Sequence, residues 1–98
     1  MTVAATLTVR ARIEGFLARL RRAFATPVLS VDGVETDLSW LGERRLVLTP
    51  GVHEVGVHYR NRRSTHGRAT TSLTVAPGGE AALDAVLVDG TFQLAVRP

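Results

Sequence analysis

The sequence predicts an all-β fold, a small antiparallel β-sandwich of about seven or eight strands, on three observations. Apolar and polar residues alternate over most of the chain, turn residues recur at short intervals, and no strand–helix–strand rhythm is present. Successive side chains of a strand point to opposite faces, so alternation indicates strands with one buried face. Several short strands at roughly 8–12-residue spacing are typical of a sandwich or small barrel.

Length and composition predict a single domain over residues 1–98. The chain is 45% hydrophobic and 21% charged, which is usual for a globular protein. It has no cysteine, which excludes disulfides and thiolate metal sites. We see no secretory leader and no apolar run of the ~20 residues that a membrane-spanning helix needs, so we expect a cytoplasmic protein.

The N-terminal part, residues 2–26, predicts one long strand followed by a basic helix. The apolar residues of the strand occupy alternate positions: Val3, Ala5, Leu7, Val9, Ala11 and Ile13. A strand of this length is longer than usual and could offer an unpaired edge to another chain. We therefore expect self-association or partner binding through this strand.

Residues 16–24 predict a short amphipathic helix. Phe16, Leu20 and Phe24 share one face at helical spacing, and the opposite face carries Arg19, Arg21 and Arg22. Nine residues form only a marginal helix in water, so this one needs a surface to lie on. Three positions stay open: over an open end of the sandwich, in a groove of a partner protein, or on an anionic membrane.

The rest of the chain, 28–97, predicts strands joined by tight turns. The Asp32-Gly33 and Asp89-Gly90 pairs indicate hairpins, because glycine accepts a positive φ. Pro50-Gly51 and Pro77-Gly78 indicate further turns. The predicted strands are 28–32, 34–38, 44–49, 53–60, 69–75, 80–87 and 92–96, with a connection at 39–43 and a seven-residue loop at 61–67.

Part of this region resembles the PEGA-type β-sandwich modules. The resemblance lies in the Val31-Asp32-Gly33 turn and in the hairpin that runs from Pro50-Gly51 through His53 to Val55 and Val57. It implies a PEGA-like core over about 28–97 and a non-catalytic role facing a protein or a glycan. The N-terminal strand and helix are additions to the compact module.

The candidate catalytic and metal-binding residues do not form a known pattern. His53 and His58 lie on opposite faces of the same predicted strand, so they cannot join one zinc site. We expect His53 to point inward and to bond backbone groups of the Pro50-Gly51 turn. No nucleophile elbow is present, and Gly78-Gly79 precedes a strand rather than the helix that a phosphate loop requires. We expect no enzyme activity, no cofactor, no metal and no small-molecule substrate.

The sequence therefore favours a non-catalytic interaction or structural module that contacts another protein or itself. The alternative is an anion-binding module that contacts nucleic acid or an acidic membrane through arginines. A second basic cluster surrounds the 61–67 loop and consists of Arg60, Arg62, Arg63 and Arg68. The predicted partner-binding residues are Phe16, Arg19, Leu20, Arg21, Arg22, Phe24, Arg60, Arg62 and Arg63.

Overall fold

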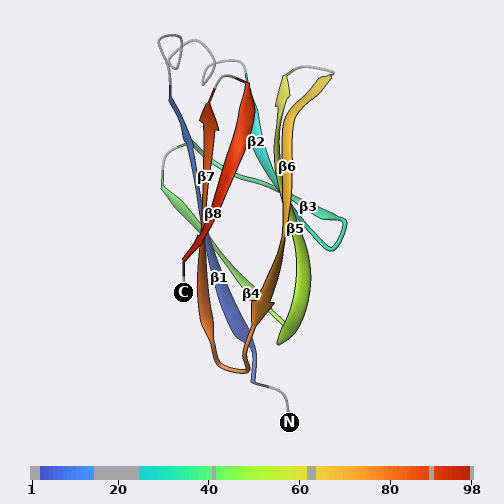
Figure 1. The fold of residues 1–98 in the computed structure, drawn as a ribbon, viewed down its shortest axis with the longest axis vertical. Helices are drawn as coiled ribbons and strands as arrows, with labels where there is room; N and C mark the ends of the chain where they lie inside the picture. Colours follow the sequence, from blue (N-terminus) through green and yellow to red (C-terminus); the bar gives the residue numbers. More distant parts are fainter. Residues whose placement is uncertain (1–2, 15–24, 41, 62–63, 89, 98) are drawn as a thin grey trace.

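The described part of the chain forms eight β-strands in two facing sheets. The computed structural model describes residues 3–14, 25–40, 42–61, 64–88 and 90–97. The strands are β1 (Ala5–Ile13), β2 (Thr26–Val31), β3 (Val34–Asp37), β4 (Glu43–Leu48), β5 (Gly51–Asn61), β6 (Ser64–Val75), β7 (Glu80–Val88) and β8 (Thr91–Arg97). One sheet has the order β4-β1-β7-β8 and the other β3-β2-β5-β6 (Figure 1). This two-sheet architecture agrees with the predicted sandwich.

The predicted fold class needs a correction, because it included a helix at 16–24. The described residues form strands and turns and contain no helix. Residues 15–24 themselves lie outside the described part. Helical spacing over nine residues is weak support for a helix, because a helix this short gains its stability from packing and not from its own sequence.

Strand β1 lies inside its sheet, which corrects two further expectations. It pairs antiparallel with β4, where Leu7 is opposite Leu46, and parallel with β7, where Leu7 is opposite Ala81. The sandwich is therefore not wholly antiparallel. Strand β4 occupies one edge of β1 over residues 5–10 and β7 occupies the other over 6–13, so most of the N-terminal strand has no free edge for another chain.

The second sheet is built from two hairpins. Asp32 and Gly33 connect β2 to β3 with φ values of 50° and 85°, the positive pair of a type I′ turn, so this predicted hairpin is confirmed. Between β5 and β6 the predicted seven-residue loop is wrong. Pairing continues to Asn61 opposite Ser64, and the register shifts between Val57 and Tyr59. At this β-bulge one strand has an extra residue, which allows the pairing to continue to the end of the hairpin. The turn residues of the sequence do not predict such a bulge.

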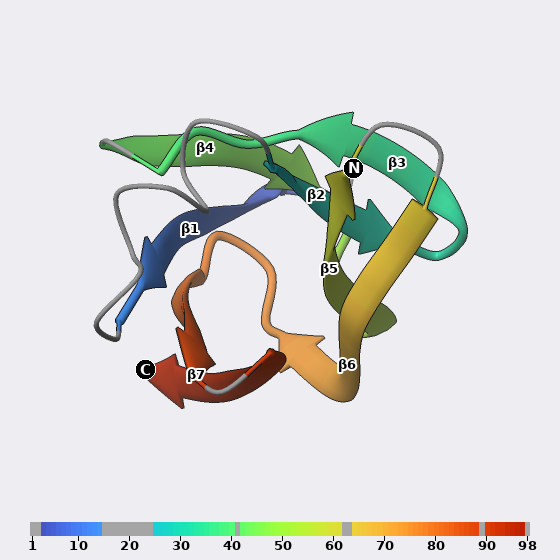
Figure 2. The ribbon, with the colours of Figure 1, turned by 90° about the horizontal axis from the view of Figure 1, so that it is seen from above.

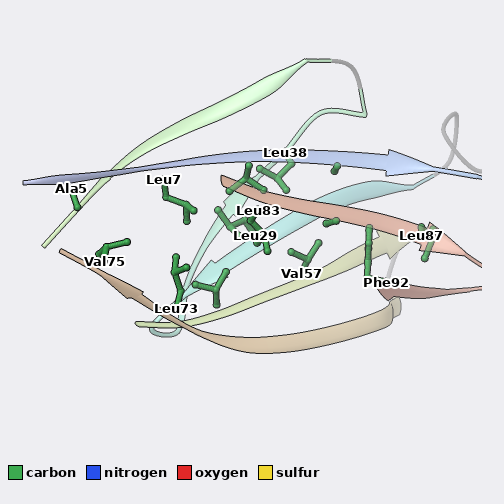
Figure 3. Close-up of a cluster of buried hydrophobic side chains, with 14 residues drawn as sticks. Ala5, Leu7, Leu29, Leu38, Val57, Leu73, Val75, Leu83, Leu87 and Phe92 are labelled. Atoms are coloured by element: carbon green, nitrogen blue, oxygen red, sulfur yellow. The ribbon is translucent and has the colours of Figure 1, made fainter. Parts of the chain in front are cut away.

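The core lies between the sheets and is almost wholly aliphatic (Figure 3). Alternate residues of β1, β5 and β7 point into it, as predicted. At one end three rings close the core: Phe92 stacks on Trp40 at 6.0 Å between centroids and meets Tyr59 edge-on at 6.4 Å. The Trp40 Nε1–H donates a hydrogen bond to the Ala25 carbonyl at 2.9 Å. Among the described residues, every buried side-chain nitrogen or oxygen has a hydrogen-bond partner.

Candidate functional site

Most of the residues predicted to bind a partner lie outside the described part of the chain. These are Phe16, Arg19, Leu20, Arg21, Arg22, Phe24, Arg62 and Arg63. Arg60 is described and lies at the end of β5, where its Nη2 donates to Asp37 Oδ1 at 2.9 Å. Its charge is therefore neutralised within the chain, and Arg60 is less available to an anion than its exposure suggests.

His53 joins two turns that are distant in sequence. Its Nδ1 lies 2.6 Å from Asp32 Oδ2, in the β2–β3 turn, and its Nε2 lies 2.6 Å from the Thr49 carbonyl, just before the β4–β5 turn. The Glu54 N–H donates to the other Asp32 oxygen at 2.9 Å. The predicted bond to backbone near Pro50-Gly51 is confirmed through Thr49. The contact with Asp32 could not be predicted, because it depends on the pairing of β2 with β5.

The geometry around His53 favours its protonated form. A carbonyl oxygen and an ionised carboxylate only accept hydrogen bonds, so the two contacts stabilise the imidazolium, in which both ring nitrogens donate. The bond to Thr49, and then the bond to Asp32, raise the pKa of His53 above its usual 6.5 against the opposing effect of burial. The bonds from His53 and from the Glu54 amide in turn lower the pKa of Asp32.

The outer face of the second sheet carries a shallow pocket of about 440 Å³, which we call the outer hollow. Its floor is a row of small residues in register across three strands, because Ser30 of β2 is opposite Gly56 of β5, and Gly56 is opposite Thr70 of β6. Charged or polar side chains surround this floor: Asp32, Glu35, Glu54, His58 and Arg68. No sequence pattern marks the hollow, since its three floor residues meet only through strand register.

His58 borders the outer hollow, and its pKa is shifted in the opposite direction to that of His53. Its side chain is only 5% exposed, and its Nε2 lies 3.5 Å from Glu35 Oε2. Burial is the main reason why the pKa of His58 is lowered. The nearby guanidinium groups of Arg68 and Arg60 lower it further, whereas the Glu35 carboxylate opposes them.

The two histidines should make the free energy of unfolding depend on pH in opposite directions. Because the pKa of His53 is raised from 6.5, its contribution to the free energy of unfolding is complete below pH 6.5 and is lost as pH rises through the folded value. The lowered pKa of His58 makes its contribution complete above pH 6.5, and it is lost as pH falls through the folded value. We expect His53→Gln to remove the loss of stability on the alkaline side and His58→Gln to remove the loss on the acidic side. Urea unfolding of the two variants over this pH range checks the signs, and identical pH profiles for both variants would contradict them.

Strand β8 differs from the other three edge strands in its charge. Strand β3 carries Glu35 and Asp37, β4 carries Glu43, Arg44 and Arg45, and β6 carries His66 and Arg68, whereas β8 has only Arg97 at its end. The Arg97 Nε lies 3.0 Å from Asp84 Oδ2 of the neighbouring β7, so this charge is balanced. Native proteins commonly protect edges with charged residues, and the edge of β8 lacks that protection.

An apolar groove of about 340 Å³ lies beside the end of β8. Strands β6 and β8, from different sheets, lie side by side at one edge of the sandwich (Figure 2). The groove lies between the Val96 end of β8 and the Leu73–Val75 part of β6. Val96 is 43% exposed. This end of β8 thus combines a free backbone edge with incompletely covered apolar side chains.

Comparisons with known proteins add no further candidate site. No known protein family, curated protein or solved structure matches this chain. Within the described ranges, no three histidine or acidic residues come together as a metal site would require. The same part of the chain contains no helix that is long and apolar enough to cross a membrane.

Proposed function

We propose that this protein is a non-catalytic β-sandwich module that associates with a second copy of itself through the free edge of β8. The observation that carries the proposal is the edge of β8, which has no charged residue before Arg97 and borders an apolar groove. The PEGA-type resemblance, which stays a prediction, agrees with an interaction role. The corrected position of β1 moves the expected self-association from the N-terminal strand to β8.

The register of the proposed dimer follows from the shape of this edge. The chain just before β8 lies close to β6, since a Cβ on Gly67 would stand 2.9 Å from the Gly90 carbonyl oxygen, so we place the second strand along the 93–97 stretch, beside the groove. An antiparallel pair centred on Ala95 places Arg97 opposite Gln93 of the other copy, and Leu94 opposite Val96. No like charges meet directly, and backbone hydrogen bonds join the two sheets into one. The apolar side chains of each added strand then cover the groove of the other copy.

A single substitution, Ala95→Lys, tests this interface. Ala95 lies on the two-fold axis of the proposed pair, so the variant brings two lysines face to face, which is unfavourable. Ala95 is exposed and stands opposite Asp84 on β7, so the same lysine has a favourable neighbour within its own chain. We expect the variant to fold normally and to be monomeric at concentrations where the wild-type protein is a dimer. Sedimentation velocity over a wide range of concentration measures the difference.

The matched control is Val34→Lys, which adds the same charge at a 70% exposed position of the edge strand β3, in the other sheet and outside the groove. It should dimerise like the wild-type protein. A wild-type protein that stays monomeric at every concentration would overturn the proposal, as would a dimer that Ala95→Lys leaves intact.

A further inference from the structure

The outer hollow has the size and the open floor of a small-ligand site. Its volume of about 440 Å³ falls within the usual range of roughly 300–1,000 Å³ for such sites. Gly56 forms the centre of the floor, where an added Cβ would stand 3.1 Å from the Thr70 methyl group. Ser30 and Thr70 flank this glycine on either side. A ligand in the outer hollow would therefore rest on Gly56 and on the flanking side chains of Ser30 and Thr70.

One end of the outer hollow carries an available positive charge. Arg68 is exposed and makes no ion pair with any described residue, in contrast to Arg10, Arg60 and Arg97. Its neighbour His58 is neutral near pH 7 because its pKa is lowered. The guanidinium group of Arg68 is thus the cation that this end offers to a carboxylate, beside the Glu35 carboxylate that lies 3.5 Å from His58 Nε2.

The opposite end carries an available negative charge. Both oxygens of Asp32 are already occupied, one by the His53 ring and the other by the Glu54 amide. The Glu54 side chain has no ion-pair partner among the described residues and is exposed. Four residues of strand separate Glu54 from His58, about 13 Å at a rise of roughly 3.3 Å per residue. Both charged side chains, Glu54 and Arg68, are long enough to lean over the floor between them.

From this arrangement we propose that the outer hollow binds a small zwitterion whose ammonium and carboxylate groups are separated by an aliphatic chain. The carboxylate pairs with Arg68, the ammonium group pairs with Glu54, and the aliphatic chain lies over Gly56. A ligand that carries only one of these two charged groups would leave the charged side chain at the other end of the outer hollow without a partner. The site should therefore discriminate against ligands that carry a single charge.

Titration with ε-aminocaproic acid tests this inference, with caproic acid and hexylamine as the single-charge comparisons. Amide chemical shifts in a 15N-labelled sample report where each compound binds. We expect ε-aminocaproic acid to shift the amides of Gly56 and Thr70 in a saturable manner. The two single-charge compounds should bind about tenfold more weakly or worse, because each lacks one charged hydrogen bond.

Two charge-removing variants locate the site, and two others control for net charge. Arg68→Gln and Glu54→Gln should each weaken binding about tenfold or more. Arg45→Gln and Glu80→Gln change the same charges at exposed positions outside the outer hollow and should leave binding unchanged. The inference fails if ε-aminocaproic acid causes no saturable shifts at Gly56 and Thr70, or if Arg68→Gln binds it as well as Arg45→Gln does. Because β8 lies in the other sheet, dimerisation through Ala95 is tested independently.

Discussion

Leu7→Ala is expected to lower the free energy of unfolding by about 2–5 kcal/mol, the usual cost of truncating a fully buried leucine. Leu7 has no exposed surface and lies in the middle of β1, which is paired on both sides. The surrounding strands cannot close the resulting cavity without losing their register. Typical domains are stable by only about 5–15 kcal/mol, so this change alone brings the protein near its limit. Urea or thermal unfolding followed by circular dichroism measures the loss.

Val47→Ala is the matched control for this prediction. Val47 lies on the neighbouring strand β4 but is 75% exposed, so its truncation should change the free energy of unfolding by no more than about 0.5 kcal/mol. Equal losses for Leu7→Ala and Val47→Ala would show that the odd-numbered residues of β1 do not face the core. That result would contradict the two-layer arrangement itself.

The core could be predicted because it depends on a local property of the sequence. Alternation with a period of two assigns Leu7 and Val9 of β1, and Leu83 and Leu87 of β7, to the buried face, and all four are buried. The Asp32-Gly33 turn could be predicted for the same reason, since the conformation needed lies within two residues. These features require no knowledge of which strand pairs with which.

The positions of strands within the sheets could not be predicted from alternation. An edge strand and an internal strand with one buried face have the same pattern, so the sequence could not show that β1 pairs with both β4 and β7. The parallel pairing of β1 with β7 joins segments about 75 residues apart, and no turn signal reports it. The loop predicted at 61–67 was wrong because residues 64–67 belong to β6, which pairs with β5 through a register shift that no local signal in the sequence reports.

The candidate sites depend on strand register, so they are harder to predict from the sequence than the core or the turns. The outer hollow exists because Ser30, Gly56 and Thr70 lie in one row, although each residue alone looks like an ordinary small residue of a strand. His58 was correctly separated from His53, but its burial on the outer face was not expected. Arginine clustering in the sequence also does not report which charges are paired, because Arg60 pairs with Asp37 whereas Arg68 makes no ion pair with a described residue.

Gly67→Ala should be the second most damaging change, with a loss of about 2–4 kcal/mol in the free energy of unfolding. Gly67 has a φ of 70°, which is unfavourable for any residue with a side chain. An added Cβ would also stand 2.9 Å from the Gly90 carbonyl oxygen and 2.9 Å from Tyr59 Cε1. The backbone of the neighbouring sheet cannot withdraw as a flexible side chain could, and Tyr59 packs edge-on against Phe92. Both the conformational strain and the steric clash therefore oppose the alanine.

Gly33→Ala separates these two effects. Gly33 has a similar φ of 85°, but an added Cβ would meet no atom within 4 Å. Its substitution should cost only the conformational strain, about 1–2 kcal/mol. The excess loss in Gly67→Ala then measures the close contact between β6 and the start of β8 at this edge of the sandwich. Equal losses in the two variants would show that this contact is not formed, and the proposed dimer, whose register assumes that β6 blocks the Gly90 end of β8, would then lose its basis.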